Sequence, residues 1–437
     1  MAEVISNAEQ VDVLIVGGGL SGCATAAAIA AGGAGRKVVI LEARAGKNPR
    51  FNGELIHPTG ADVLAERGFL GPLHEAGGAD VSGFACVREV GRPATLLPYR
   101  EIAGSRPHGF AIDHHDLVDT LRREVLRRPG VELRSGERVV SVVRDQERVI
   151  GVTTASGTVL AKLVIGCDGR HSKLRTLFGM EERATLLSFT AAALLADCEL
   201  PHPGFGHIFL GAWGPILAYP INNKDARTCI DLPADMDRGT EAVIARIRSG
   251  YLPFLPPSVK SSLLRALDAG EIELAANYSI RTEECTVPGA ALLGDACGCS
   301  HPLTATGMTV ALTDTRLLGE ALAGIDLGSR EQVDRALEQY QTRRYRYVRA
   351  REVLADALYE VFRGVDDGAR AIREGIFRYW GSSSGSRARS MALLSGHESR
   401  LPAFLREYLT VVGMSTSSVL RGEVNEPSLA GRMRSLY

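Results

Sequence analysis

The clearest chemistry in the sequence lies in a strand-like segment that ends in Gly294-Asp295. Four apolar residues precede this pair, so the Asp295 carboxylate stands at the end of a buried strand, where it can accept hydrogen bonds from sugar-like hydroxyls. The loop that follows ends at Gly307, where an uninterrupted helical pattern begins. Backbone N–H groups at a helix N-terminus attract an anion or an electron-rich ring. An isoalloxazine ring on a ribityl diphosphate presents both kinds of group at once.

A second segment, from Val13 to Gly22, places glycines between an apolar strand and an Ala-rich helix. Gly17 allows a tight turn, Gly19 lets the backbone approach a pyrophosphate, and Gly22 permits close packing of helix on strand. Glu42 follows 20 residues after Gly22, at the end of the next strand, where an acid can hold both ribose hydroxyls. An acid disfavours the 2′-phosphate of NADP, so this segment indicates FAD or NAD.

Composition narrows the class of protein. The chain has 437 residues, of which 45% are hydrophobic and 23% charged, as is typical of a globular protein with two or three units. A net charge of -1 gives no domain-wide basic field, so we do not expect nucleic acid as a partner. The sequence has no run of about 18 apolar residues, and its first ten residues have no apolar core, so neither a transmembrane segment nor a signal peptide is expected.

Eight cysteines are scattered along the chain without a disulfide framework, which predicts a reducing, cytoplasmic location. Cys297, Cys299 and His301 stand close together, but a second pair of ligands is missing, so no metal site is predicted. No Ser/His/Asp or Cys/His nucleophilic set is apparent either.

The elements that must position these residues interleave along the chain. The pattern predicts an α/β fold, in which a Rossmann-type FAD-binding domain is interleaved with an antiparallel-sheet substrate domain and followed by C-terminal helices. We assign residues 11–75, 111–180 and 281–325 to the FAD-binding domain, residues 76–110 and 181–280 to the substrate domain, and residues 326–437 to the helical region. Residues 382–390, rich in Ser and Gly, are predicted as a loop. A ligand pocket is expected where the two domains meet.

Together these segments resemble the aromatic-hydroxylase-like FAD-dependent monooxygenases, and most closely the squalene epoxidase (squalene monooxygenase) family. Arg50 to Gly60 (RFNGELIHPTG) is similar to that family's Arg-x-x-Gly-Glu-x-x-x-Pro-Gly-Gly segment. His301 to Leu312 (HPLTATGMTVAL) is similar to its His-Pro-Leu-Thr-Gly-Gly-Gly-Met-Thr-Val-Ala stretch. The likeness extends from Val11 to about Gly396.

The resemblance implies an oxidoreductase that inserts one oxygen atom from O₂, by epoxidation or hydroxylation, through a C4a-hydroperoxyflavin. The expected substrate is hydrophobic and electron-rich, such as a prenylated aromatic, a terpenoid or a polyketide of secondary metabolism. Squalene itself is less expected, because Phe84 replaces a Tyr of the family's active site and the family's N-terminal membrane anchor has no counterpart here. The resemblance leaves room for peripheral contact with a membrane.

Electrons must come from NADPH or NADH. No second glycine-rich strand–turn–helix follows Gly22, so the nicotinamide either binds transiently on the flavin domain or gives its electrons to a separate flavin or ferredoxin-type reductase. Two alternative functions remain open at this point, namely a flavin-dependent reductase of isoprenoid double bonds and a non-oxygenating flavoprotein that binds a hydrophobic ligand. The Trp-x-Trp-x-Ile-Pro pattern of flavin halogenases is absent.

The resemblance also implies individual contacts with the cofactor. Leu20 and Ser21 belong to the phosphate loop, Glu42 and Ala43 to the adenosine ribose, Arg50 to the middle of the cofactor, Val139 to the adenine, Asp295 to the ribityl chain and pyrophosphate, and Gly307 and Met308 to the isoalloxazine, which lies over Pro302 to Gly307. The candidate catalytic residues are His301, His57 and Pro302. The candidate substrate contacts are Phe84, Phe209, Trp213 and Tyr219, although ordinary core packing explains any one of these aromatic residues equally well.

Two departures from the family concern the cofactor. Ala305-Thr306 replaces two glycines of the flavin loop and makes it bulkier. Asp116 stands where the family has an Arg at the start of a helix, which removes one cation from the diphosphate; Arg122 and Arg123 follow on the same helix.

Overall fold

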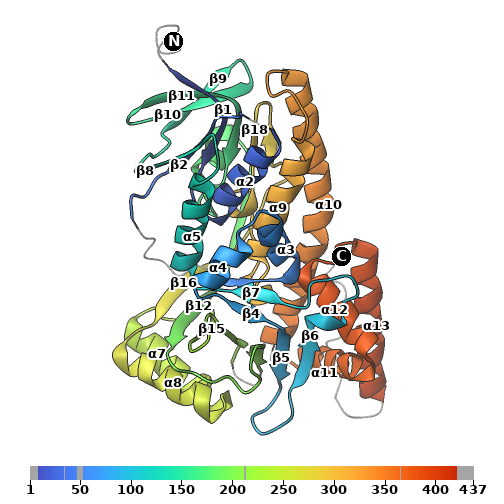
Figure 1. Cartoon of the computed structure of the whole chain (residues 1–437). Helices are drawn as coiled ribbons and strands as arrows, with labels where there is room; N and C mark the ends of the chain where they lie inside the picture. The colour runs from blue at the N-terminus through green and yellow to red at the C-terminus, as the bar shows by residue number, and fades with distance from the viewer. Residues whose placement is uncertain (1–7, 34, 47–52, 211–212, 365, 421–437) are drawn as a thin grey trace.

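The computed structural model describes residues 8–33, 35–46, 53–210, 213–364 and 366–420. Among them are two large sheets, a small sheet of three strands and a set of C-terminal helices (Figure 1). The predicted α/β fold class is confirmed. The division into residue sets by domain stays a prediction, and Arg50 lies outside the described residues.

The first sheet lies in the upper half of Figure 1 and has the strand order β17-β18-β11-β1-β2-β8, with β10 and β9 continuing from β11. Its strands are β1 (Glu9–Val16), β2 (Val38–Glu42), β8 (Val131–Ser135), β9 (Ser141–Asp145), β10 (Arg148–Thr154), β11 (Gly157–Gly166), β17 (Thr286–Val287) and β18 (Ala290–Leu292). β1 pairs in parallel with β2 and β11. Their residues 13–16, 38–41 and 163–165 form continuous buried apolar runs, because parallel strands with helices on both faces are buried on both sides.

Helices flank this sheet. They are α2 (Leu20–Ala31), α3 (Pro58–Glu66), α4 (Leu70–Glu75), α5 (His114–Leu126), α6 (Lys173–Phe178) and α9 (Gly307–Ala321). Three of them, α2, α6 and α9, follow the strands β1, β11 and β18 along the chain. Helix α6 is capped at Ser172, whose Oγ accepts the N–H of Arg175, and Asp168 accepts the N–H groups of Lys173 and Leu174. Short 3-10 turns occur at η1 (Tyr99–Glu101), η2 (Leu252–Phe254), η3 (Gly294–Ala296) and η4 (Pro302–Thr304).

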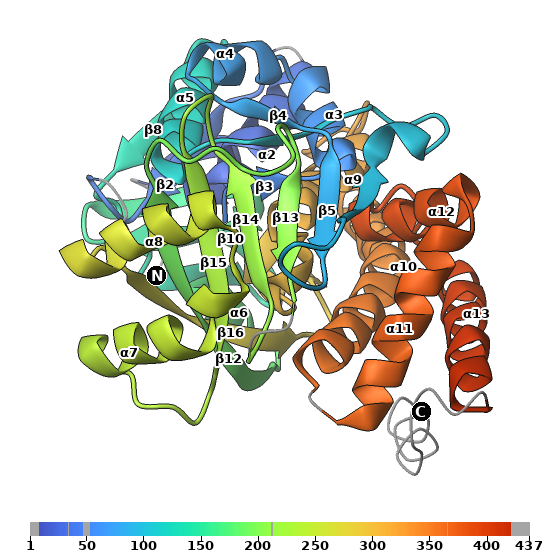
Figure 2. The same cartoon turned by 90° about the horizontal axis from the view of Figure 1, so that it is seen from below.

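The second sheet has the order β16-β12-β15-β14-β13-β5-β6. Its strands are β5 (Gly83–Val87), β6 (Thr95–Pro98), β12 (Arg183–Leu195), β13 (Gly206–Phe209), β14 (Ile216–Pro220), β15 (Ala226–Pro233) and β16 (Glu273–Arg281). Helices α7 (Thr240–Gly250) and α8 (Pro257–Ala269) cover one face, and the C-terminal helices stand on the other side (Figure 2). Along β14, side chains alternate between the two cores, Ile216 and Ala218 on one side and Leu217 and Tyr219 on the other.

A small sheet of order β3-β7-β4 joins the two large ones. It consists of β3 (Leu55–Ile56), β4 (Ala79–Val81) and β7 (Gly109–Ala111), so it combines a strand that follows the first glycine-rich segment with two strands from residues 76–110.

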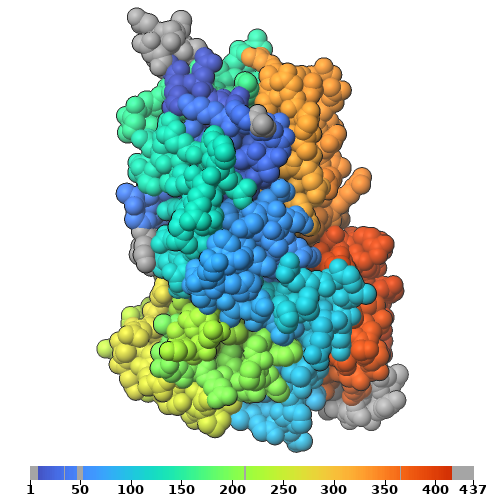
Figure 3. Space-filling view, in the orientation of Figure 1, coloured from blue at the N-terminus to red at the C-terminus, as the bar shows by residue number. Residues whose placement is uncertain are grey.

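The C-terminal region consists of α10 (Arg330–Arg363), α11 (Asp367–Ser382), α12 (Ser384–Ser395) and α13 (Leu401–Leu420). In Figure 3 these last helices, in red, lie directly against the cyan segment that holds β5 and β6. The prediction of a loop at residues 382–390 was wrong, because Ser383 Oγ accepts the N–H of Ser386 and starts α12 there. None of the helices in the described ranges is long and apolar enough to cross a bilayer.

Candidate active site

The first glycine-rich turn is open where a cofactor would need space. A Cβ on Gly17 (φ 106°) would lie 2.3 Å from the Cys167 carbonyl oxygen, and one on Gly22 would lie 1.8 Å from the Gly17 carbonyl oxygen. Both positions therefore require glycine for packing. At Gly19, by contrast, no heavy atom lies within 4 Å of the Cβ position, and no side chain caps α2 there. Leu20 and Ser21 begin α2 beside this open space, and N–H groups at a helix N-terminus suit a bound diphosphate.

Glu42 stands beside this turn at the end of β2. Its Oε2 accepts the Gly18 N–H at 2.9 Å and pairs with Arg122 Nη2 at 3.1 Å, while its Oε1 accepts the Arg44 N–H. Arg122 also donates to the Gly18 carbonyl at 2.7 Å. This cation from α5 is held against the phosphate loop, whereas Asp116 is exposed in a surface groove of the same helix.

Two further residues predicted at the adenosine lie at the same corner. Ala43 directly follows Glu42. Val139 is buried, and the segment that holds it is fastened here by a hydrogen bond from the Glu137 N–H to the Glu42 carbonyl. The structure thus brings Glu42, Ala43 and Val139 into one neighbourhood.

The second half of the cradle is formed by η3 and the start of α9. Asp295 is half-buried, and a Cβ on Gly307 would lie 3.9 Å from its Oδ1. Burial raises the pKa of the Asp295 carboxyl, against the influence of nearby Arg170. No hydrogen bond to this carboxylate occurs among the described residues, and no side chain caps α9. A half-buried carboxylate acceptor and the uncapped N–H groups of Gly307 and Met308 suit the ribityl hydroxyls and the ring of FAD, so the residues present fit this cofactor.

The loop from Pro302 to Gly307 contains a strained residue at a position where the family that the chain resembles has glycine. Ala305 has a φ of 51°, in the left-handed region where an L side chain is strained. The hydroxyls of Thr304 and Thr306 are hydrogen-bonded at 2.9 Å across it. Pro302 is exposed and begins the η4 turn.

His57 fastens this loop to β3. Its Nε2 lies 2.9 Å from the Thr304 carbonyl oxygen, which can only accept, so Nε2 carries the hydrogen. Its Nδ1 therefore accepts a hydrogen bond from the Tyr99 hydroxyl at 2.6 Å. The backbone N–H of His57 donates to Thr309 Oγ1. Burial lowers the pKa of His57 to about 4, so it is neutral at physiological pH.

Tyr99 also supplies a hydroxyl close to Phe84, where the family Tyr is replaced. The ring centroids of Phe84 and Tyr99 are 6.3 Å apart, and that of His57 lies 5.9 Å from each.

His301 belongs to a buried polar network beneath the loop. Its Nδ1 accepts the Leu303 N–H at 3.1 Å, so Nε2 carries the hydrogen and meets Ser188 Oγ at 2.8 Å and Asp231 Oδ1 at 3.2 Å. The Tyr359 ring stacks on it at 4.0 Å. Both Ser188 and Asp231 contact the same nitrogen, whereas a catalytic triad needs the acid and the serine on opposite ones, so this is not a nucleophilic set.

A buried ion pair joins the cofactor side to the second sheet. Arg227 on β15 donates from Nε and Nη2 to the two oxygens of Glu54, at 2.9 and 2.7 Å. Tyr219 OH adds a third hydrogen bond to Glu54 at 3.2 Å, and Asp113 Oδ2 lies 3.6 Å from Arg227 Nη2. The sequence had assigned Tyr219 to the substrate wall, and the structure places its hydroxyl in this junction.

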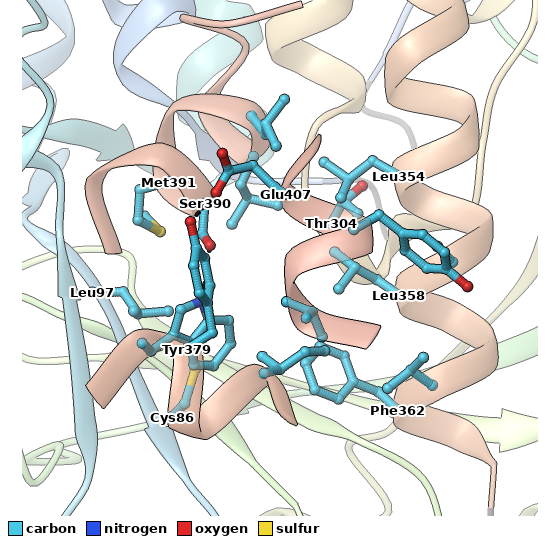
Figure 4. A pocket seen from close by; sticks show the side chains of 18 of the residues that line it. Cys86, Leu97, Thr304, Leu354, Leu358, Phe362, Tyr379, Ser390, Met391 and Glu407 are labelled. Atoms are coloured by element: carbon cyan, nitrogen blue, oxygen red, sulfur yellow. Dashed lines mark hydrogen bonds between the residues drawn. The ribbon is translucent and has the colours of Figure 1, made fainter. Parts of the chain in front are cut away.

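An apolar cavity lies between the second sheet and the C-terminal helices (Figure 4). Its volume is about 130 Å³, and Leu303 and Thr304 of the flavin loop form part of its wall. Phe84, a predicted substrate contact, lines it. Phe209 instead packs into the core on the α7–α8 side, and Trp213 is 50% exposed under the Arg246 guanidinium, so neither reaches this cavity.

Most of the cavity wall comes from helices that sequence analysis had not connected with the site. Leu354, Leu358 and Phe362 follow one another at intervals of four on α10, and α11 to α13 complete this side. The four-residue spacing of apolar side chains was the available signal. It could not show whether that face meets a core or a cavity.

The described part of the chain contains no group of three or more His, Cys, Asp or Glu side chains that could hold a metal ion. Cys297 is buried beside Thr282, and both ring nitrogens of His301 are engaged as described above.

Comparison with known proteins agrees with this geometry. The family model described as squalene epoxidase matches residues 160–433, and a model described as an NAD(P)-binding Rossmann-like domain matches residues 15–67. Squalene epoxidase 3 of Arabidopsis thaliana is 30% identical over 93% of this chain and 78% of its own length. A squalene epoxidase of Aspergillus fumigatus is 30% identical over 84% of this chain and 79% of its own length.

Solved structures share the fold at lower identity. The p-nitrophenol 4-monooxygenase PnpA of Pseudomonas putida superposes with a TM-score of 0.74 at 18% identity and covers 89% of this chain and all of its own (100%). PqsL of Pseudomonas aeruginosa, in complex with 2-aminobenzoylacetate, gives a TM-score of 0.70 at 22% identity, over 81% of this chain and 97% of its own.

Proposed function

The chain belongs to the squalene epoxidase family and is an FAD-dependent monooxygenase, and we propose that its substrate is an apolar, electron-rich prenylated aromatic, terpenoid or polyketide. The observation that carries this proposal is the apolar cavity whose wall includes Leu303 and Thr304 of the flavin loop. The two alternatives, a double-bond reductase and a flavoprotein without oxygen chemistry, are not favoured, because the relatives are epoxidases and monooxygenases.

Bound FAD supplies oxygen activation, and the protein supplies binding, orientation and shielding from water. We assign the diphosphate to the open turn at Gly19, the ribose to Glu42, and the ribityl hydroxyls to Asp295. The first N–H groups of α9, at Gly307 and Met308, would meet the electron-rich edge of the ring. No reacting proton is assigned to His57 or His301, because the protein itself engages both nitrogens of each ring.

Those two histidines are better explained as positioning residues. His57 holds the loop at Thr304 from one side, and His301 holds it at Leu303 from the other. Because the loop borders both the flavin position and the cavity, fixing it fixes where the substrate carbon stands relative to the flavin.

Oxygen insertion into a panel of substrates tests the proposal. The purified protein, with FAD, NADPH and a flavin reductase, is incubated under isotopically labelled O₂ with squalene, prenylated indoles, quinolones and polyenes. We expect one labelled oxygen atom in a prenylated aromatic, terpenoid or polyketide product. Efficient epoxidation of squalene and of nothing else in the panel would refute the substrate class.

We propose that a separate reductase supplies the electrons. Supporting this, the first sheet provides one glycine-rich turn of the dinucleotide type within the described residues, and that turn is assigned to FAD. Anaerobic mixing with NADPH alone should leave the visible absorbance of oxidised flavin unchanged over the time of one turnover, and addition of a reductase should bleach it. Rapid bleaching by NADPH alone would show direct reduction instead.

Peripheral membrane contact, in a cytoplasmic protein, completes the proposal. Leu405 and Leu409 are 45% and 59% exposed on α13, the helix that also contributes Phe404 and Tyr408 to the cavity wall. We expect co-sedimentation with phospholipid vesicles, weakened by Leu405→Glu and Leu409→Glu. If the parent protein and the variants stayed in the soluble fraction to the same extent, this contact would be excluded.

A further inference from the structure

Three polar side chains interrupt the apolar wall of the cavity at one place. They are Tyr379 of α11, Ser390 of α12 and Glu407 of α13, and each comes from a different helix. In Figure 4 they lie together on one side of the cavity, with Thr304, Leu354 and Leu358 on the other. Burying polar groups in an apolar surface costs free energy unless hydrogen bonds compensate, so their convergence calls for a reason.

Glu407 is the centre of this cluster. Only 7% of it is exposed, and burial raises the pKa of its carboxyl. Its Oε2 accepts hydrogen bonds from Tyr379 OH and from Arg389 Nε, and its Oε1 accepts one from Arg406 Nε at 2.9 Å. The side chains of Arg389 and Arg406 are 47% and 66% exposed. The two cations therefore approach from the solvent side and balance the carboxylate without entering the cavity.

Ser390 adds a donor to this acceptor. Its Oγ accepts the Trp380 indole N–H at 3.0 Å. Its own O–H has no acceptor among the described residues, although the side chain borders the cavity. The cluster thus offers both a carboxylate acceptor and a hydroxyl donor.

We infer that this cluster binds a neutral hydroxyl of an otherwise hydrocarbon substrate, so that the substrate is an alcohol or a phenol and not a pure hydrocarbon. A hydroxyl is the group that donates to Glu407 and accepts from Ser390 at the same time. A cationic head is disfavoured because Arg389 and Arg406 already balance the carboxylate. An anionic head would face that carboxylate. The inference rests on the proposed function, in that it specifies the substrate of the same cavity.

Ligand binding measured without turnover tests this inference. Trp380 borders the cavity, whereas Trp213 lies outside it. In a Trp213→Phe background, quenching of Trp380 fluorescence therefore reports ligands in the cavity. The probes are geranylgeraniol and the hydrocarbon of the same skeleton with a methyl group in place of its CH₂OH.

We expect the alcohol to bind about ten-fold more tightly than the hydrocarbon, as one or two net hydrogen bonds predict. Glu407→Leu should reduce this preference to below about two-fold without weakening hydrocarbon binding, and Ser390→Ala should reduce it in part. Glu407→Gln, which keeps the shape of the side chain, serves if the leucine variant does not fold. Glu398→Gln, at a carboxylate paired with Arg400 outside the cavity wall, is the matched control and should keep the full preference.

Equal affinity of the two ligands for the parent protein would overturn the inference, as would a preference that survives Glu407→Leu. Because binding does not require oxygen, failure of the proposed function is distinguishable. In that case the alcohol would still bind selectively, but no labelled oxygen would enter any product.

Discussion

Ala305 has a strained backbone conformation. With a φ of 51° it holds a conformation that costs an L residue roughly 1 kcal/mol relative to glycine, in a loop beside the flavin position. We expect Ala305→Gly to raise the free energy of unfolding by about 0.5–1 kcal/mol, as measured by urea denaturation. Gln146 (φ 55°) lies in the turn between β9 and β10, so Gln146→Gly is the matched control and should stabilise similarly. A destabilised Ala305→Gly protein beside a stabilised Gln146→Gly protein would contradict this explanation.

His57 makes stability depend on pH. Its pKa is about 4 in the folded protein and 6.5 in its ordinary state, so the unfolded chain takes up a proton first as the pH falls. Stability should therefore be lost between pH 6.5 and about 4, by up to about 3 kcal/mol. His57→Gln keeps a donor for Thr304 and an acceptor for Tyr99 but does not titrate. The difference between the urea midpoints at neutral pH and at about pH 4.5 should be smaller in this variant than in the parent protein. If the difference were the same in both, His57 would not be the source of the pH dependence.

At the scale of one element, the start of α2 separates folding from cofactor binding. Gly19 has an ordinary φ of -88° and open space at its Cβ position. We expect Gly19→Ala to leave the thermal midpoint of the FAD-free protein unchanged while it weakens FAD binding. At an FAD concentration 100 times the Kd of the parent protein, the free energy of unfolding of the parent should rise by about 2.7 kcal/mol. That of the variant should rise much less at the same FAD concentration. Gly22→Ala is the contrasting substitution, since its Cβ would collide with the Gly17 carbonyl and should destabilise the protein even without FAD. If FAD raised the stability of the Gly19→Ala protein as much as that of the parent protein, the diphosphate would not bind at this turn.

Elements were predictable where local pattern and burial agree. Residues 13–16 of β1 and residues 38–41 of β2 are buried apolar runs, and the glycine turn after β1 has the geometry that its spacing predicts. β16 was not predicted as a strand, because Leu274-Ala275-Ala276-Asn277 lacks β-branched residues and is held by pairing with β12. α12 was missed because its serines are typical of loops, yet one of them caps the helix. For the site, motifs located the cofactor residues, whereas the cavity depends on how distant helices pack and leaves no comparable motif.

At the scale of the whole molecule, Glu54 and Arg227 join the segment beside the cofactor to the second sheet. Arg227 is buried, so Glu54→Ala removes both hydrogen bonds that its guanidinium donates to the Glu54 carboxylate. We expect a loss of about 3–5 kcal/mol in urea denaturation. The double variant Glu54→Leu, Arg227→Met should recover most of this loss, because it removes both members of the buried pair. A loss below about 1 kcal/mol for Glu54→Ala would mean that the pair does not hold the two parts together.

The two halves of the long helix α10 contact different parts of the protein. Its first half is tied to the cofactor side through Tyr340 OH on the Leu292 carbonyl and Arg344 on Asp314. Its second half, from Leu354 onward, begins the helical wall of the cavity, which α11 to α13 complete. One contiguous stretch, from Leu354 to Val411, thus supplies that helical wall, and segments that precede it in the sequence supply the cradle. A single crossover between relatives near the middle of α10 would exchange the whole helical wall at once, so evolution can change the accepted molecule while inheriting the cofactor machinery intact.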